Sequence, residues 1–274
     1  MAHLIVTRPA DQAAPWLKVL RDMGHVAVAL PLIEIAPVES EDDAQALELA
    51  WARLKSFDAL MFVSSSAAQA FFKPNRPFAG VESAQRAIDL IVNKYPNIRL
   101  WATGQGTVAS LRSLGIPAHR IDAPSAQAGQ FDSEALWQVV QDQIRGASRV
   151  LILRGRDVGL FDSSRDWLAQ QIMARGGVPT KLVVYERRAP KWSLAQTAQC
   201  SAWLRDGSIW LLSSSQALRN LPASLDARQG ICICTHERIA QAAKERGFAV
   251  VCTSRPTLQD VAASIKSLNE RSSA

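Results

Sequence analysis

The sequence contains the stretch Ile209-Trp210-Leu211-Leu212-Ser213-Ser214-Ser215-Gln216-Ala217-Leu218, in which four large apolar residues run into three serines and then into helix formers. A short apolar run bounded by a turn is typical of a strand that is buried on both faces. Serine is a strong N-cap residue, because its hydroxyl accepts a hydrogen bond from a free N–H of the first helical turn. The stretch therefore predicts a strand, a tight turn with free N–H groups, and a helix.

The same pattern occurs earlier in the chain, as Leu60-Met61-Phe62-Val63-Ser64-Ser65-Ser66-Ala67-Ala68. Two copies of one unit indicate a chain built from two similar halves. The predicted strand-to-helix turns fall into two sets, Thr7-Arg8-Pro9, Ser213-Ser214-Ser215 and Thr235-His236-Glu237, and Ser64-Ser65-Ser66, Thr103-Gly104-Gln105-Gly106-Thr107 and Arg154-Gly155-Arg156. Each set has one arginine turn, one triple-serine turn and one threonine turn, and the first set is split around the second. This order predicts a domain made from both ends of the chain, with a similar domain inserted into it.

Strands that alternate with helices predict an α/β fold with parallel sheets and right-handed crossovers. We expect a discontinuous domain over residues 1–33 and 189–274, and an inserted domain over residues 38–183. The segments 31–38 and 181–190 read as extended, and prolines bracket the first of them, which suits a linker better than a sheet centre. They are predicted to form a two-stranded linker.

The charge of the chain limits the kinds of partner that it can bind. It has 274 residues, a net charge of +6 and a pI of about 9.4. Lys and Arg are spread without a basic run, which argues against a nucleic-acid partner and favours a polyanionic small molecule. No stretch approaches the roughly 20 apolar residues of a membrane span, and the N-terminus lacks the basic region of a signal peptide. We therefore expect a cytoplasmic protein without a membrane partner.

Metal and disulfide chemistry are not indicated. The four cysteines form no C-x-x-C pair, and Cys232 and Cys234 lie two apart in an apolar strand. The four histidines lack the spacing of metal ligands. We expect buried reduced thiols and no metal.

In open parallel sheets, ligands bind beyond the carboxyl ends of the strands, where helix N-termini suit anions. We expect the turns of both domains to face each other across a cleft, with Arg8, Arg154 and Arg156 adding positive charge. For any single turn, simple helix capping remains the alternative. The candidate binding residues are Arg8, Ser64, Ser65, Ser66, Gly104, Gln105, Gly106, Thr107, Arg154, Gly155, Ser213, Ser214, Ser215, Thr235 and His236.

Two other function classes stay open. Gly104, Gly106 and Ala109 fit the dinucleotide fingerprint, and Asp122 lies near its acidic position, which would suit a nicotinamide-dependent oxidoreductase. Against this, the equivalent turn of the other half, Thr235-His236-Glu237, has no glycine. A non-catalytic sensor of an anionic ligand is the second alternative.

Over nearly its whole length the chain resembles the uroporphyrinogen-III synthase family. The order and spacing of several short stretches carry the resemblance: Val6-Thr7-Arg8-Pro9, Val63-Ser64-Ser65-Ser66-Ala67, Gly104-Gln105-Gly106-Thr107-Val108-Ala109, Ser133-Glu134-Ala135-Leu136, Val150-Leu151-Ile152-Leu153-Arg154-Gly155, Val184-Tyr185-Glu186-Arg187-Arg188, Ser213-Ser214-Ser215-Gln216-Ala217-Leu218 and His236-Glu237-Arg238-Ile239-Ala240.

The resemblance implies two flavodoxin-like α/β domains joined by a two-stranded linker. It also implies a lyase of haem biosynthesis that cyclises the linear tetrapyrrole hydroxymethylbilane, with inversion of ring D and loss of water, without metal or cofactor. The family tyrosine proposed to help the hydroxyl group leave falls on Tyr185. Without the resemblance, packing of the Tyr185 ring between the domains is the simpler interpretation. We expect a monomer.

Overall fold

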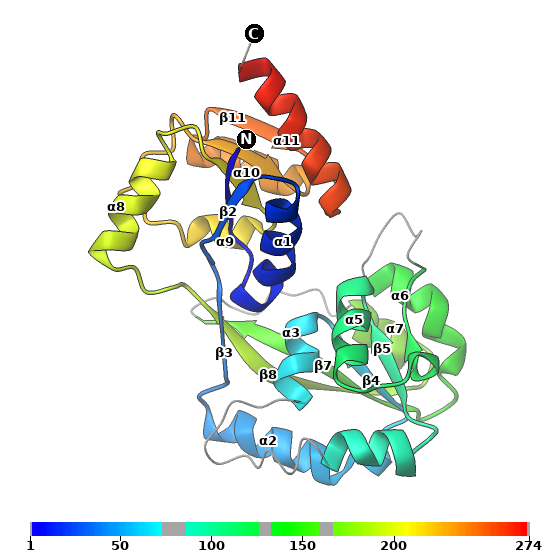
Figure 1. Ribbon diagram of the computed structural model, residues 1–274. Helices are drawn as coiled ribbons and strands as arrows, with labels where there is room; N and C mark the ends of the chain where they lie inside the picture. The colour runs from blue at the N-terminus through cyan, green and yellow to red at the C-terminus, as the bar shows by residue number, and fades with distance from the viewer. Residues whose placement is uncertain (1, 73–85, 126–132, 159–166, 273–274) are drawn as a thin grey trace. The chain divides into compact units, whose positions relative to one another are not determined.

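The computed structural model describes residues 2–72, 86–125, 133–158 and 167–272. The chain divides into two compact units (Figure 1). Unit 1 comprises Met1–Glu34 and Arg188–Ala274, and unit 2 comprises Ile35–Arg187. Both ends of the chain thus belong to unit 1.

Unit 1 contains a parallel sheet of five strands in the order β2-β1-β9-β10-β11. The strands are β1 (His3–Val6), β2 (Val26–Ala29), β9 (Ile209–Leu212), β10 (Ile231–Cys234) and β11 (Val250–Thr253). The helices are α1 (Ala10–Asp22), α8 (Leu194–Trp203), α9 (Ser215–Arg219), α10 (Glu237–Arg246) and α11 (Leu258–Ser272). Apolar side chains of α1 and α11 cover one face of the sheet, where Leu4 and Val6 are fully buried.

Unit 2 contains a sheet of six strands in the order β3-β8-β7-β4-β5-β6. The strands are β3 (Glu34–Ala36), β4 (Ala59–Phe62), β5 (Arg99–Ala102), β6 (Ile121–Asp122), β7 (Arg149–Asp157) and β8 (Val178–Arg188). The described α-helices are α2 (Glu41–Ala52), α3 (Ser65–Phe72), α5 (Gln105–Ser113), α6 (Ser133–Val140) and α7 (Trp167–Ala174). Three short 3₁₀-helices, η1 (Leu54–Ser56), η3 (Ala118–Arg120) and η4 (Gln141–Gln143), and a short π-helix, η2 (Leu90–Lys94), accompany them.

The two sheets match strand for strand. In unit 1 the order β2-β1-β9-β10-β11 is 2-1-3-4-5 in chain order, the flavodoxin order. In unit 2 the strands β8-β7-β4-β5-β6 take the same places, but the chain enters at the third of them. In unit 1 the threonine turn follows β10, the serine turn follows β9 and the arginine turn follows β1. In unit 2 the corresponding segments lie at the carboxyl ends of β5, β4 and β7. The predicted α/β fold with parallel sheets is confirmed.

The segment Arg154-Gly155-Arg156 was predicted as a turn, and this prediction is wrong. It belongs to β7, which continues to Asp157. The strand continues because β8 runs beside it and pairs with it as far as Arg187. The register shifts between Arg154 and Gly155, where Val184 is the extra residue on β8. The sequence pattern read the glycine as a turn residue, whereas it lies in a strand opposite this bulge.

The segments predicted as a two-stranded linker lie in the sheet of unit 2. Most of 181–190 belongs to β8, where Leu182 and Val184 are buried in the core. The strand β3, from the segment 31–38, is the neighbour of β8 at the edge of the sheet.

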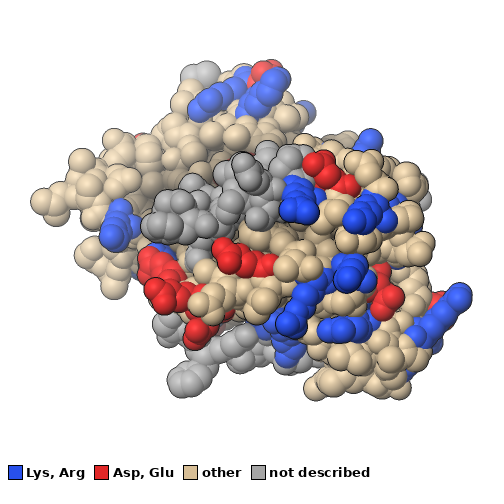
Figure 2. Space-filling model, turned by 90° about the horizontal axis from the view of Figure 1, so that it is seen from below, with Lys and Arg blue, Asp and Glu red and all other residues tan. Residues whose placement is uncertain are grey.

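Within the described residues, no helix is long and apolar enough to cross a membrane. The same residues contain no group of three or more His, Cys, Asp or Glu side chains placed to hold a metal ion. On the face that Figure 2 shows, Lys and Arg side chains stand beside Asp and Glu side chains, and among the described residues they form no unbroken basic surface.

Candidate functional site

The site in unit 2 lies where the direction of the chain across the sheet reverses. Strands β4 and β7 are neighbours, but α3, which follows β4, and α7, which follows β7, pack on opposite faces. Phe71 of α3 belongs to the core on one face, and Ile172 of α7 to the core on the other. Ligands of open parallel sheets bind at such a switch point, beyond the carboxyl ends of the strands.

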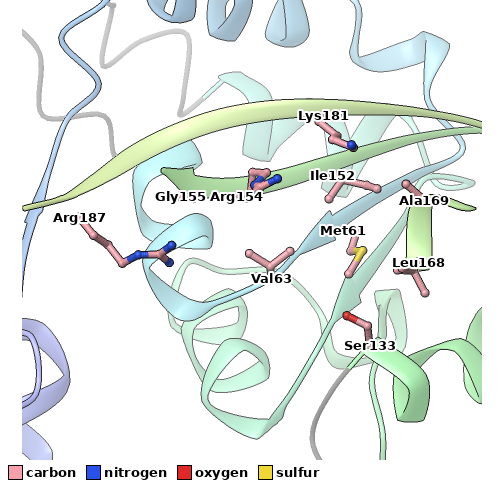
Figure 3. A pocket seen from close by; sticks show the side chains of 10 residues that line it. All are labelled: Met61, Val63, Ser133, Ile152, Arg154, Gly155, Leu168, Ala169, Lys181 and Arg187. Carbon is pink, nitrogen blue, oxygen red and sulfur yellow. The ribbon is translucent and has the colours of Figure 1, made fainter. Parts of the chain in front are cut away.

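A pocket of about 250 Å³ lies at this switch point (Figure 3). Its walls come from β4, β7, β8, α6 and α7, all of them in unit 2. The residues that line it are Met61, Val63, Ser133, Ile152, Arg154, Gly155, Leu168, Ala169, Lys181 and Arg187.

Three cations share this pocket with an apolar lining. Lys181 of β8 is opposite Ile152 of β7, and Arg154 lies two residues further along β7, so both cationic side chains are on one face of the sheet (Figure 3). Arg187 lies near the end of β8. Cationic groups above apolar side chains suit a carboxylate that is carried on a short hydrocarbon stem.

Tyr185 is held beside the pocket. Its side chain packs in the core of unit 2, and the residue is only 3% exposed. Its hydroxyl oxygen lies 3.1 Å from Ser64 Oγ, and Arg187 Nη1 donates to the same oxygen at 3.4 Å. Sequence reasoning placed Tyr185 and Ser64 in the site separately, and the structure brings them together.

Gly155 makes this position of the ring possible. A Cβ atom on Gly155 would lie 2.3 Å from Tyr185 Cζ, so only glycine lets the tyrosine ring lie against the backbone of β7. Gly155 and Arg187 both contact Tyr185, and both line the pocket. The phenol therefore contacts two residues of the pocket wall without lining the pocket itself.

The orientation of Arg187 is fixed by Asp157. The guanidinium donates to both carboxylate oxygens, from Nε to Oδ1 and from Nη2 to Oδ2, the latter at 3.0 Å. Partial burial opposes the charge, but the pairing with Asp157 outweighs it and raises the pKa of Arg187. The third nitrogen, Nη1, is the one that donates to Tyr185.

Arg156 was expected to add positive charge to the site, but acidic side chains match its charge. It pairs with Glu186 at 2.7 Å and with Asp43 at 2.8 Å. The hydrogen bond to Glu186 raises the pKa of Arg156. Its charge is matched because it pairs with acidic side chains of α2 and β8.

The serines and the threonine of the predicted turns in unit 2 differ in their contacts and in their exposure. Ser64 Oγ accepts a hydrogen bond from the backbone N–H of Ala67 at 3.1 Å and so caps α3. Ser65 is partly exposed, whereas Ser66 is 2% exposed and Thr107 is 5% exposed. The side chains of Ser66 and Thr107 are therefore placed for packing rather than for contact with a ligand.

The glycine turn caps α5. Gly104 is its N-cap residue, and a Cβ on Gly106 would meet no atom within 4 Å. The Gln105 side chain donates to the Pro124 carbonyl at 2.8 Å. Asp122, the acidic residue of the dinucleotide alternative, is bound to Arg99 by hydrogen bonds of 2.6 and 2.8 Å. An Asp122 carboxylate held in this way is not free to bind a ribose.

In unit 1 the predicted residues again lie at the carboxyl ends of the strands. The Arg8 guanidinium lies 4.2 Å from the centre of the Trp16 ring, and burial lowers the pKa of Arg8. Ser213 and Ser214 join β9 to α9, which begins at Ser215, and Ser214 Oγ caps the helix.

The threonine turn of unit 1 also forms a cap. Thr235 N donates to the Leu212 carbonyl at 3.1 Å. His236 is the N-cap residue of α10, and its Nδ1 accepts from Arg238 N at 3.1 Å. His236 thus caps α10 with its side chain.

Comparison with known proteins identifies the family of this chain. The family model described as "Uroporphyrinogen-III synthase HemD" matches residues 14–263. The chain belongs to the uroporphyrinogen-III synthase family. The nicotinamide-dependent and sensor alternatives find no support in the comparisons.

Two curated relatives illustrate the match. The uroporphyrinogen-III synthase of Chlorobaculum parvum is 28% identical over 217 residues, which cover 78% of this chain and 74% of that protein. The uroporphyrinogen-III synthase of Escherichia coli is 27% identical over 256 residues, which cover 89% of this chain and 92% of that protein.

Two solved structures of the family share the fold. The uroporphyrinogen-III synthetase of Helicobacter pylori aligns with a TM-score of 0.59 at 16% identity, over 98% of this chain and 100% of that chain. A mutant uroporphyrinogen III synthase from Thermus thermophilus aligns with a TM-score of 0.52 at 12% identity, over 99% and 100% of the two chains.

Three charged residues of the site were not among the predicted ones. Lys181 lies within an apolar strand pattern, Asp157 follows a segment that reads as a turn, and Arg187 is one of two adjacent arginines. The sequence did carry a signal for Lys181. A lysine side chain is almost never fully buried, so a lysine in a strand inside a sheet indicates an opening at one face of that sheet.

Proposed function

We propose that this chain is an enzyme that cyclises hydroxymethylbilane to uroporphyrinogen III, with inversion of ring D and loss of water. The observation that carries the proposal is the family match over residues 14–263. The cationic pocket at the switch point of unit 2 supports it, because the substrate bears an acetate and a propionate on every ring.

The pocket is the proposed subsite for one of these acidic side chains. Its apolar residues suit the methylene groups of a propionate, and Arg154, Lys181 and Arg187 suit the carboxylate. Helix N-termini at the neighbouring turns supply N–H groups for further carboxylates. Substrate binding is therefore shared between side-chain charges and the backbone.

The chemistry requires positioning more than a strong catalytic group. Loss of water from the hydroxymethyl group gives an electrophilic azafulvene, which closes head to tail without inversion when it is unaided. The enzyme has to fold the chain so that the substituted carbon of ring D attacks, through a spiro intermediate. Fixed dipoles and a bound conformation of the substrate favour that attack.

Tyr185 is the proposed source of the proton for the departing hydroxyl group. A phenol is a hydrogen-bond donor, and general-acid assistance of this kind contributes about 100- to 10,000-fold to a rate. The contacts to Ser64 and Arg187 hold the phenol at the carboxyl ends of β4 and β7. We expect its contribution to lie on the low side, because the substrate loses water readily.

No step of this scheme needs a metal or an organic cofactor, and we propose that none is used. Purified protein that has been dialysed against a chelator and freed of nucleotides is expected to keep its activity. Restoration of lost activity by a metal ion or by NAD would overturn this part of the proposal.

The proposed function is tested with enzymatically generated hydroxymethylbilane and separation of the two isomers. The III isomer is expected to dominate with the protein, and the I isomer without it. If the protein yielded the I isomer at the spontaneous rate, the assignment would be wrong.

A further inference from the structure

The burial of Tyr185 raises the question of how its proton reaches a substrate. The residue is 3% exposed, and its hydroxyl lies 3.1 Å from Ser64 Oγ. Ser64 is partly exposed, at the first turn after β4, next to Val63 of the pocket lining. Of the two hydroxyl groups in this contact, the one that a substrate can touch is therefore that of Ser64.

We propose that Ser64 is the catalytic residue that gives a proton to the departing hydroxyl group, and that Tyr185 acts through Ser64. This inference rests on the proposed function. It assigns the contact with the reacting atoms to Ser64, and it makes Tyr185 a positioning residue that resupplies the proton.

The relay uses the donors and acceptors of both hydroxyl groups. A hydroxyl group has one donor and two acceptor sites. Ser64 Oγ accepts from Ala67 N at 3.1 Å, and Arg187 Nη1 donates to the Tyr185 oxygen. In the proposed relay the Tyr185 O–H donates to Ser64 Oγ, which fills the second acceptor site of that oxygen. The Ser64 proton is then donated outward.

Arg187 completes the relay as an electrostatic support. Its bond to the Tyr185 oxygen is long, 3.4 Å, for a neutral phenol. When Tyr185 passes its proton to Ser64, a phenolate forms. The charged guanidinium of Arg187 donates a stronger hydrogen bond to the phenolate oxygen than to the oxygen of the neutral phenol. Asp157 keeps Arg187 aimed at this oxygen, so the contact strengthens as the charge develops.

Atoms and electrons balance in this step. The C–O bond of the hydroxymethyl group breaks with its electron pair on oxygen, and the Ser64 proton completes a water molecule. The Tyr185 proton moves to Ser64 Oγ, which leaves a phenolate opposite the cationic azafulvene. After the ring closes, the proton lost as the last pyrrole regains its aromaticity restores the Tyr185 phenol.

A double-mutant cycle on the full-length protein tests the relay. Ser64→Ala and Tyr185→Phe are each expected to lower the turnover number for III-isomer formation about 10- to 100-fold, with little change in KM. The variant with both changes is expected to be no slower than the slower single variant, because both changes break one proton path. Ser64→Thr keeps a hydroxyl group and is expected to recover most of the turnover.

The control separates the relay from helix capping. Ser64→Ala also removes the cap of α3, so Ser40→Ala, which removes the Ser40 cap of α2 in the same unit, is measured beside it. Ser40→Ala is expected to lower thermal stability without changing turnover.

Two outcomes would overturn the relay while leaving the proposed function intact. One is normal turnover of Ser64→Ala in a protein that makes the III isomer. The other is a double variant whose loss is the product of the two single losses. A wild-type protein that makes no III isomer would instead overturn the proposed function.

Discussion

The hydroxyl oxygen of Tyr185 lies 3.1 Å from Ser64 Oγ, although the two residues are 121 positions apart in the chain. Ser64 caps α3 after the end of β4, and Tyr185 lies in β8, two strands away. The missing side chain of Gly155 lets the tyrosine ring lie across the intervening strand β7. This contact ties the triple-serine turn to the segment that joins the two units.

Gly155→Ala is expected to displace the Tyr185 ring. The new Cβ would lie 2.3 Å from Cζ and 2.5 Å from Cε2, so either the ring or the backbone of β7 must move. We expect a loss of about 1 to 3 kcal/mol in the free energy of unfolding, as for other overpacked sites, and a loss of turnover with it. Denaturant unfolding and the III-isomer assay measure the two effects.

The matched control for this change is Gly106→Ala, where a Cβ meets no atom within 4 Å. Its free energy of unfolding should stay the same or rise slightly, because alanine favours a helix. A Gly155→Ala protein as stable as Gly106→Ala would show that the contact between Gly155 and Tyr185 does not hold in solution.

Lys181→Met is expected to weaken substrate binding. Methionine keeps the length of the apolar stem and removes the charge beside Arg154 in the pocket. Because Lys181 is exposed, we expect KM to rise only about 3- to 10-fold at low salt, with turnover unchanged and the difference shrinking as salt is added.

Two variants calibrate this measurement. Lys181→Arg keeps the charge and should keep KM near the wild-type value. Lys94→Met removes the same charge from η2, away from the pocket residues, and should leave KM unchanged. If Lys94→Met raised KM as much as Lys181→Met, the effect would be one of overall charge and not of the pocket.

The repeat was readable from the sequence because each copy is local. An apolar run, a serine cap and a helix occupy about ten consecutive residues around Ser64 and again around Ser214, so pattern alone places them at the carboxyl ends of parallel strands. The same reasoning correctly identified the α/β fold.

The pocket and the phenol network were not readable, because they depend on pairing between distant residues. The segment around Gly155 has the composition of a turn, and only its pairing with β8 makes it part of a strand. The partners Arg187 and Asp157 are 30 positions apart, and both depend on that register.

Alkaline pH is expected to destabilise the protein through Cys200. Cys200 is fully buried in α8, and burial raises the pKa of its thiol from 9.0 to about 11. The folded state therefore favours the protonated thiol. This contribution is complete below about pH 9 and is lost as the pH rises from 9 to 11, by about 2 kcal/mol.

The measurement is the difference in unfolding free energy between the wild type and Cys200→Ala, followed from pH 8 to pH 11. We expect this difference to shrink with rising pH. A constant difference for Cys200→Ala would contradict the assigned cause.

The location of the site can be tested through the two tyrosines of the chain, Tyr95 and Tyr185. Tyr95 precedes β5, at the amino edge of the sheet of unit 2, whereas Tyr185 lies at the carboxyl edge with Ser64. Protein labelled with ¹³C at Cζ of tyrosine gives one NMR signal for each, and Tyr95→Phe assigns them.

The most direct test of the site is titration of this labelled protein with uroporphyrinogen III under anaerobic conditions. The account predicts that the Tyr185 signal shifts and saturates while the Tyr95 signal stays in place. A shift of Tyr95 alone, or saturable binding that leaves the Tyr185 signal unmoved, would contradict a site at the carboxyl ends of β4 and β7.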